Sequence, residues 1–164
     1  MKKILFVLVL VVACSQNILA QLNSKTHTVT LSINNILELD FDNTTQVLGF
    51  TFANAADFES GKTNLSAAGL RVRSNKPWTV SVKANTANFA ATSGGDGNVL
   101  SSTLSVRKNG TTSAIALSTT DQALATGDRG GFGVNTFLID YIANPGYVTP
   151  ATYSLGITFT VTAP

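Results

Sequence analysis

The sequence contains very few of the side chains that carry most catalytic chemistry. It has one cysteine, Cys14, and one histidine, His27. A single cysteine cannot form an intramolecular disulfide, so packing and backbone hydrogen bonds must stabilise the fold. A single histidine argues against a histidine-based zinc site and against a Ser-His-Asp or Cys-His centre. We therefore expect no metal and no cofactor, and we interpret His27 as a solvent-facing residue at a strand edge.

Charged side chains are also scarce. They make up 12% of the chain, with 11 Lys and Arg against 9 Asp and Glu. Two of the lysines, Lys2 and Lys3, lie in the first segment described below, so the remainder of the chain carries 11 − 2 = 9 basic residues against 9 acidic ones. No basic stripe is present that could neutralise phosphates, so nucleic acid is not an expected partner.

The first twenty residues have the pattern of a bacterial export signal. A cationic start is followed by an apolar run over residues 4–12, and Ala20 supplies a small residue before the expected cleavage site. We predict a signal peptide over residues 1–20 and a secreted or cell-surface protein formed by a single domain, residues 21–164. An alternative is a lipoprotein signal that ends at Cys14. No apolar run reaches the roughly 20 residues of a transmembrane segment.

Long helical patterns are missing, and apolar residues recur instead at every second position. This spacing, with many Thr and Val residues and with Gly, Asn and Pro between the segments, is typical of short strands. The first four predicted strands contain these sets: Val29, Leu31 and Ile33; Leu37, Leu39 and Phe41; Leu48, Phe50 and Phe52; Leu70 and Val72.

Three later segments complete the predicted fold. A strand over residues 75–84 should bury Trp78, Val80, Val82 and Ala84. Asn109-Gly110 predicts a type I′ turn that joins residues 102–107 and 111–117 in a hairpin. A strand with Phe137, Ile139 and Tyr141 is expected to pair with the terminal strand. These elements indicate an all-β protein, an immunoglobulin-like antiparallel two-sheet β-sandwich.

Two pairs of carboxylates are candidates for hydrolytic chemistry. Asp57 and Glu59 flank Phe58, and Asp40 and Asp42 flank Phe41. On a strand, each pair would share one face about 6 to 7 Å apart, which is compatible with a glycosidase. The same pattern arises wherever a buried Phe alternates with exposed acids, and a chain of this length has little room for a substrate cleft.

The loops offer candidates for ligand binding. Asp96 and Asp128 lie in glycine-rich loops and could supply oxygen ligands to calcium, but neither has the spacing of an EF-hand, and Asp is common in turns. Tyr147, in a proline-rich loop, is the best candidate for stacking on a glycan. Trp78 would contact a glycan only if its strand faced the other way.

The terminal strand has an unusually regular apolar face. Tyr153 and, after it, Leu155, Ile157, Phe159 and Val161 alternate with small polar residues. Residues 149–153 resemble a tyrosine corner, after which an immunoglobulin domain has one more strand. We expect that the place beside the terminal strand is filled by residues 25–33, either of the same chain or of another molecule. Val29, Leu31 and Ile33 are the candidate donor residues; Leu155, Ile157, Phe159 and Val161 form the candidate acceptor strand.

Three segments carry a resemblance to a known group of proteins. Residues 36–41, 74–82 and 150–163 resemble those of small secreted bacterial domains of the pilin-like or spore-coat-U-like type. The resemblance implies an extracellular, non-enzymatic sandwich that assembles with other subunits by strand donation. The chain departs from it in having no pilin disulfide and no penultimate tyrosine.

The sequence therefore predicts a cell-surface structural or adhesion subunit that acts by strand pairing and surface contact and catalyses no reaction. Its partners would be other surface subunits or further copies of itself. The alternatives are a carbohydrate-binding module that uses Tyr147, and a small hydrolase that uses Asp57 and Glu59.

Overall fold

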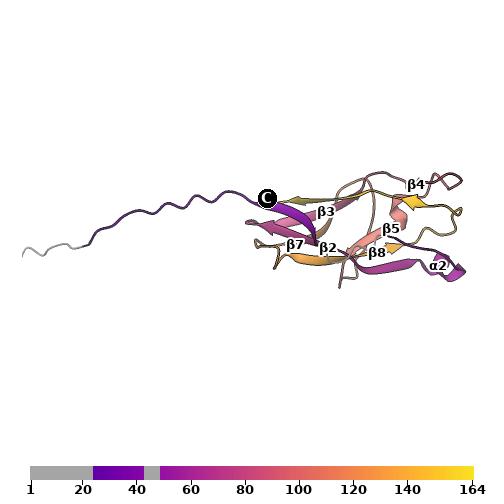
Figure 1. Cartoon of the computed structure of the whole chain (residues 1–164), viewed down its shortest axis with the longest axis horizontal. Coiled ribbons are helices and arrows are strands. Elements are labelled where there is room, and N and C mark those ends of the chain that lie inside the picture. Colours follow the sequence, from indigo (N-terminus) through magenta and orange to yellow (C-terminus); the bar gives the residue numbers. More distant parts are fainter. Residues whose placement is uncertain (1–23, 43–48) are drawn as a thin grey trace, which may run out of the picture. The chain divides into compact units, whose positions relative to one another are not determined.

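A computed structural model describes residues 24–42 and 49–164 of the chain, which divides into two units, Met1–Ile33 and Asn34–Pro164 (Figure 1). In the first unit, residues 24–33 form neither helix nor strand. The strand predicted there is therefore wrong for the isolated chain. Its apolar residues Val29, Leu31 and Ile33 are 73%, 82% and 81% exposed. The predicted signal peptide lies outside the described residues.

The regular secondary structure described for the second unit is almost entirely antiparallel strand, which confirms the all-β prediction. A five-stranded sheet has the order β1-β2-β8-β5-β6. Its strands are β1 (Leu37–Asp42), β2 (Lys62–Ser74), β8 (Thr136–Ala143), β5 (Leu104–Lys108) and β6 (Ile115–Ala116). The alternating apolar residues predicted for β1 and for the end of β2 lie on these strands.

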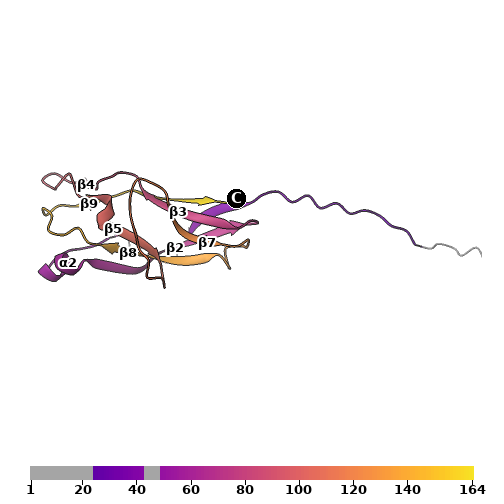
Figure 2. The same ribbon diagram turned by 180° about the vertical axis from the view of Figure 1, so that it is seen from behind.

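A three-stranded sheet has the order β10-β3-β7, and a two-stranded sheet pairs β4 with β9. Their strands are β3 (Trp78–Ala84), β7 (Gln122–Gly127), β10 (Ile157–Thr162), β4 (Ala90–Ala91) and β9 (Tyr153–Ser154). The described helices are α2 (Ala55–Ser60) and the 3-10 turn η1 (Ser101–Thr103). Within the second unit, α2 lies at the end opposite the C-terminus (Figure 2). No helix in residues 24–42 and 49–164 is long and apolar enough to cross a membrane.

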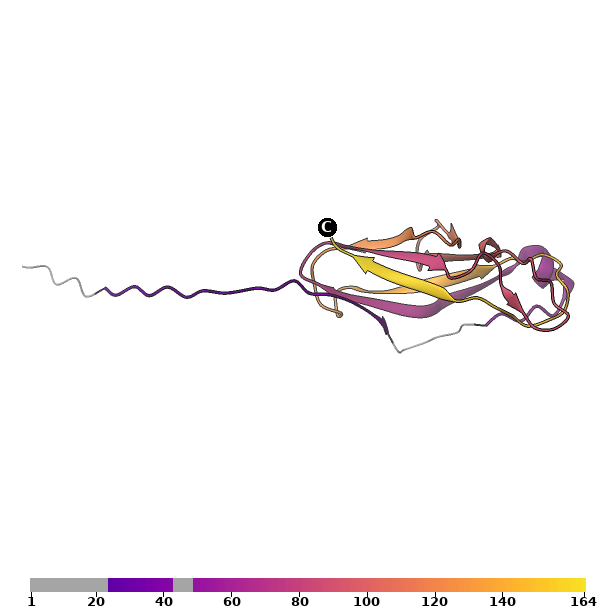
Figure 3. The same ribbon diagram turned by 90° about the horizontal axis from the view of Figure 1, so that it is seen from above.

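Buried residues of the two larger sheets belong to one hydrophobic cluster, and the strands that carry them can be followed in Figure 3. Leu70 and Ile139 of the five-stranded sheet and Val80 and Val82 of the three-stranded sheet have at most 1% of their surface exposed. As predicted, every second residue of β3 is buried, from Trp78 to Ala84. The burial of each such side chain stabilises the fold by roughly 1.5 to 3 kcal/mol.

Several strand predictions were wrong in their pairing or extent. The strand with Phe137, Ile139 and Tyr141 pairs with β2 and β5, whereas β10 pairs with β3. Periodicity finds a strand but carries no information about its neighbours. Phe50 and Phe52 are part of no strand, since residues 49–53 are irregular and lead into α2. That helix begins where Asn54 accepts a hydrogen bond from the backbone of Asp57, a cap that the sequence reading missed.

The predicted hairpin exists, but its turn differs. β5 and β6 are antiparallel neighbours, and Thr111 donates a backbone hydrogen bond to Lys108 across the turn. Gly110 has a φ of 82°, whereas Asn109 keeps a negative φ, so the turn is not type I′. The Asn109 side chain instead donates to the Asp140 carboxylate at 2.8 Å. This hydrogen bond is a tertiary contact that the local Asn-Gly pattern does not reveal.

Candidate functional site

On one side of the second unit, a connecting segment of the chain crosses from the five-stranded sheet to the three-stranded sheet. After β6 the chain crosses to β7 through residues 117–121. The backbone of Leu117 donates to Leu104 of the five-stranded sheet at 2.9 Å, and the carbonyl of Ser118 accepts from Ala84 of the three-stranded sheet at 2.8 Å. Leu117 is fully buried. This crossing segment therefore seals the core along that side.

Among the described residues, no strand or crossing segment covers the opposite side, where β1 and β10 form the sheet edges. A groove of about 320 Å³ lies between these strands. Its lining residues are Leu39, Asp40, Phe41, Leu70, Ile157, Thr158 and Phe159. The rings of Phe41 and Phe159 meet across it, with centroids 6.0 Å apart and planes at 88°. Apolar side chains that point toward the core thus remain only partly covered along this groove.

The outer edge of β10 carries backbone groups available for pairing. Asn85 donates its backbone N–H to the carbonyl of Gly156, so these two residues form a hydrogen-bonded pair between β3 and the start of β10. Hydrogen-bonded and non-hydrogen-bonded pairs alternate along an antiparallel ladder. Ile157, Phe159 and Val161 therefore direct their N–H and C=O groups away from β3. Among the described residues, β10 has no strand neighbour on that side. Three of the four predicted acceptor residues lie on this edge, and Leu155 precedes the strand.

The outer edge of β1 has fewer backbone groups available for pairing with an added strand. Asn75 donates its backbone N–H to Ile36, so by the same alternation Phe41 directs its own N–H away from β2. That N–H already donates to the carboxylate of Asp40 at 2.9 Å, and Arg71 holds the same carboxylate at 2.7 Å. The hydrogen bond from Arg71 keeps the pKa of Asp40 below its ordinary value. An added strand therefore finds free backbone groups on β10 more readily than on β1.

Asn75 also fixes the chain just before β1. Its side-chain oxygen accepts from the backbone N–H of Ile36 at 3.1 Å, and its side-chain nitrogen donates to the carbonyl of Asn34 at 2.8 Å. Together with the backbone hydrogen bond from Asn75 to Ile36, these contacts prolong the pairing with β2 beyond Leu37. We call this arrangement the Asn75 clamp. It leaves no reverse turn at residues 34–36.

The contact that a tyrosine corner implies is present ahead of β10. The hydroxyl of Tyr153 donates to the carbonyl of Thr149 at 2.7 Å and accepts from the backbone N–H of Asp96 at 2.9 Å. The Asp96 carboxylate in turn accepts from the hydroxyl and the backbone N–H of Thr149, at 2.6 and 2.7 Å. These hydrogen bonds hold the pKa of Asp96 below its ordinary value. The loop that leads into β9 is thereby fixed at Thr149, a few residues before the strand begins.

The candidate hydrolytic carboxylates do not form the predicted pair. Asp57 and Glu59 lie on α2 and not on a strand, and residues two apart on a helix point in different directions. Asp57 accepts from the backbone of Ala53 at 2.8 Å, and Lys62 Nζ lies 3.4 Å from it. Asp57 thus stabilises the start of the helix. Asp40 and Asp42 do share a strand, but Asp40 is bound to Arg71.

The calcium candidates have structural partners. Asp96 binds Thr149, and the carbonyl of Asp128 accepts from Trp78 Nε1 and from the side chain of Asn135, both at 3.0 Å. In the part of the chain that the structure describes, no three His, Cys, Asp or Glu residues come together as a metal site would require. His27 is exposed and lies outside any strand.

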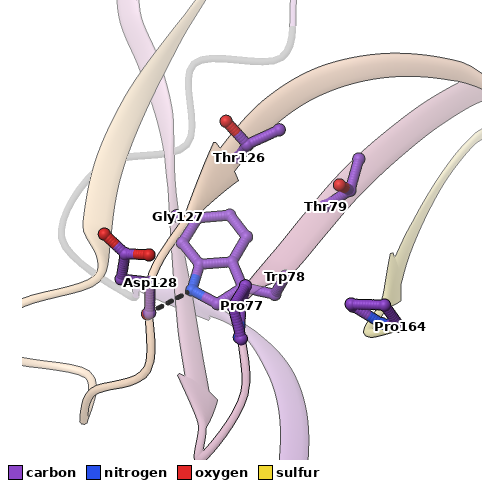
Figure 4. Close-up of a pocket in the computed structure, with 7 residues that line it drawn as sticks. All are labelled: Pro77, Trp78, Thr79, Thr126, Gly127, Asp128 and Pro164. Atoms are coloured by element: carbon purple, nitrogen blue, oxygen red, sulfur yellow. Dashed lines mark hydrogen bonds between the residues drawn. The ribbon is translucent and has the colours of Figure 1, made fainter.

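The single tryptophan is a core residue. Trp78 is 4% exposed and stacks on Phe137 with ring centroids 6.1 Å apart. Figure 4 shows its hydrogen bond to Asp128 beside a hollow of about 470 Å³ that Pro77 and Pro164 also line. A Cβ at Gly127 would lie 2.2 Å from the indole, so only glycine fits there. Glycan contact through Trp78 is therefore excluded, whereas Tyr147 is 73% exposed.

Asp140 forms a buried polar cluster that the sequence reading missed. Its side chain is fully buried, although it points to the outer face of β8. It accepts from the backbone of Ser66 at 2.9 Å, from Arg107 at 2.9 Å and from Asn109 at 2.8 Å. Ser66 has a φ of 51° in an irregular stretch of β2. A lone acid in a strand gave no sign of these partners, which come from β2 and from the end of β5 with the turn that follows it.

No protein-family model and no curated protein sequence matches this chain.

Proposed function

We propose that this protein is a secreted cell-surface structural or adhesion subunit that assembles by accepting a β-strand along the groove between β1 and β10. Its fold would be an immunoglobulin-like sandwich in which the place beside β10 receives the added strand. The sheet order supports this interpretation, because β1, β2, β8 and β5 correspond to the four-stranded sheet of that fold, and β3 and β10 to two strands of the other.

The observation that carries the proposal is the difference between the two sides of the core. One side is sealed by residues 117–118, which hydrogen-bond to both sheets. The other side has an apolar groove and a strand edge with outward backbone groups on Ile157, Phe159 and Val161. Exposed strand edges of this kind readily pair with another strand, and natural proteins usually cover them.

The proposed occupant is the segment 25–33 of a second copy of the chain. Val29, Leu31 and Ile33 are exposed and stand two residues apart, which is the spacing needed to place three side chains on one face of a strand. Main-chain hydrogen bonds to β10 would supply affinity, and these side chains would fill the groove. The pairing itself requires no catalytic step.

The Asn75 clamp favours donation between molecules. A chain that folds back into its own groove must reverse direction before β1. If the clamp stays intact, the reversal must come before Asn34, which removes Leu31 and Ile33 from the pairing segment. A second molecule can offer all three apolar residues without any reversal.

Light scattering after size exclusion tests the proposal on a chain that begins at Gln21. The parent chain should form a ladder of oligomers that grows with concentration. Leu31→Asp should reduce the chain to monomers, because a carboxylate would have to be buried in the groove. Ser32→Asp is the matched control. It adds the same charge one residue along, on the opposite face of the donated strand, and should keep the ladder.

A chain that remains monomeric at high concentration would contradict the proposal, provided that its far-ultraviolet circular dichroism shows a folded β protein. Equal loss of the ladder in the two variants would also contradict it, because the effect would then follow charge and not the strand face.

A further inference from the structure

A row of aromatic rings lies at the end of the second unit occupied by α2. Phe50 and Phe52 have ring centroids 6.5 Å apart, Phe52 and Phe58 are 5.5 Å apart, and Phe58 and Tyr147 are 5.3 Å apart. The last two rings are almost parallel, at 14°. Phe58 belongs to α2, and Tyr147 to the loop between β8 and β9. The row shares no residue with the groove between β1 and β10.

The outermost ring has one free face. Tyr147 stacks one face of its ring on Phe58, yet its side chain is 73% exposed. Such exposure with one face covered requires that the other face be open to solvent. Most large aromatic side chains bury their rings, so a ring displayed in this way is a preferred contact surface.

The ring is also held in place. The Phe58 stack fixes its orientation, and the loop that carries it is tied down two residues later by the hydrogen bonds between Thr149 and Asp96. The hydroxyl of Tyr153 secures the same loop at the carbonyl of Thr149. A contact surface that is rigid before binding loses less conformational entropy when a ligand arrives.

The polar group beside the ring restricts the chemistry of the ligand. The hydroxyl of Tyr147 lies 3.5 Å from Oε1 of Glu59, which is exposed on α2. A carboxylate accepts hydrogen bonds and repels anions. Lys62 is a basic side chain that contacts α2, and it already binds Asp57 and the carbonyl of Thr51. These groups disfavour an anionic ligand and suit one that carries hydroxyl donors and has a flat apolar face.

We propose that Tyr147 and Glu59 form a binding site for a neutral hexopyranose unit of a glycan. The C–H face of the pyranose would pack on the free face of Tyr147, and Glu59 would accept hydrogen bonds from its hydroxyls. The site is independent of strand acceptance, so an assembly subunit would carry a glycan contact at the end of the domain marked by α2.

Binding to immobilised polysaccharides tests the site on the full chain from Gln21. The probes are laminarin, a β-galactan and a mannan as neutral glycans, with alginate as an anionic comparison. The parent chain should bind at least one neutral probe and bind alginate more weakly. Tyr147→Ala should weaken that binding at least tenfold, Tyr147→Phe should retain most of it, and Glu59→Gln should weaken it severalfold. Val134→Ala is the matched control, because Val134 is 81% exposed and lies in the loop before β8.

Three results would overturn the proposal. The first is that the parent chain binds no neutral probe, and the second is that binding persists in Tyr147→Ala. The third is that Tyr147→Ala reduces the oligomer ladder instead, which would make the ring a protein contact. Because Leu31→Asp should bind glycan as a monomer, failure of the glycan site and failure of strand acceptance give separate results.

Discussion

Phe41 of β1 and Phe159 of β10 meet edge to face across the open side of the core, with ring centroids 6.0 Å apart. They belong to different sheets, and no strand or crossing segment among the described residues covers the gap between them. Phe41 is 41% exposed, whereas residues at the sealed side, such as Leu117, are fully buried. An incoming strand would therefore gain apolar contact with both sheets at once.

A proline in β10 tests whether the outer backbone of this strand pairs with an added strand. Val161→Pro removes an N–H that the ladder directs away from β3, so the fold should tolerate it, as edge strands tolerate proline. The loss of one interstrand hydrogen bond, about 1 kcal/mol, and the steric bulk of the ring should weaken assembly by roughly tenfold. Sedimentation velocity measures the change.

The control for that substitution is Val161→Ala, which shortens the same side chain and keeps the N–H. It should assemble more tightly than Val161→Pro. Equal assembly of the two variants would mean that the outer backbone of β10 does not pair.

The Asn75 clamp predicts a local change in hydrogen exchange. Asn75→Ala removes the acceptor for the Ile36 N–H and the donor to Asn34, so the Ile36 amide should exchange faster with solvent. Freed from the clamp, the segment before β1 can reverse, and the fraction of monomer should rise. Asn75→Asp keeps the acceptor and should protect Ile36 better than Asn75→Ala does. Unchanged exchange of the Ile36 amide in Asn75→Ala would show that the Asn75 side chain does not hold this segment.

The buried carboxylate of Asp140 should be a main source of stability and of its pH dependence. Burial opposes its ionisation, but hydrogen bonds from Asn109, Ser66 and Arg107 and the charge of Arg107 outweigh burial and lower the pKa of Asp140. A lowered pKa in the folded state means that this stabilisation is complete above the ordinary pKa and is lost as the pH falls through the folded value.

Asp140→Ala leaves the half-buried donors of Ser66 and Arg107, and the exposed side chain of Asn109, without their acceptor. It should lower the free energy of unfolding by roughly 2 to 4 kcal/mol, measured by urea denaturation at pH 7. Its unfolding free energy should also change less between pH 6 and pH 3 than that of the parent chain. A parallel decline in both chains would assign the acid sensitivity to other groups.

Tyr141 should make the fold sensitive to alkali. Burial raises the pKa of its hydroxyl to about 12, from 10.0. Because the folded state holds the proton more tightly, this stabilisation is complete below pH 10 and is lost as the pH rises toward 12, by about 2 to 3 kcal/mol. Urea denaturation at pH 8 and pH 11.5 measures the loss. Tyr141→Phe should lose less stability over that interval, and an identical loss would show that the pKa of Tyr141 is the same in the folded and the unfolded chain.

Local pattern predicted the individual strands better than their arrangement. The alternation of Trp78, Val80 and Val82 located β3 and its buried face, because a half-buried strand imposes a period of two on the sequence. The partner of β8 could not be found in this way, since any strand with one apolar face satisfies the same pattern. The turn at Asn109 also carries a hydrogen bond to Asp140, 31 residues away in sequence, which a local pattern does not reveal.

The residues of the candidate site were likewise predictable from the sequence, but their contacts across the two sheets were not. Ile157, Phe159 and Val161 were identified from alternation, and the structure places them at a sheet edge. The partner across the groove, Phe41, was identified only as a strand residue, because its position beside Phe159 follows from the topology of both sheets. Asp57 and Glu59 were placed on a strand because a single helical turn with an Asn cap is too short to show helical periodicity.

Cysteine cross-linking between two variants tests strand donation most directly. The chain from Gln21 contains no cysteine, so one copy can carry Leu31→Cys and another can carry cysteine at position 157, 159 or 161. A disulfide requires Cα atoms within about 7 Å, so it forms only where the two segments lie side by side. Strand donation predicts a mixed disulfide dimer for at least one of these positions, and a much lower yield when Ser32→Cys replaces Leu31→Cys. No mixed dimer at any position, or equal yields from the two donor variants, would contradict it.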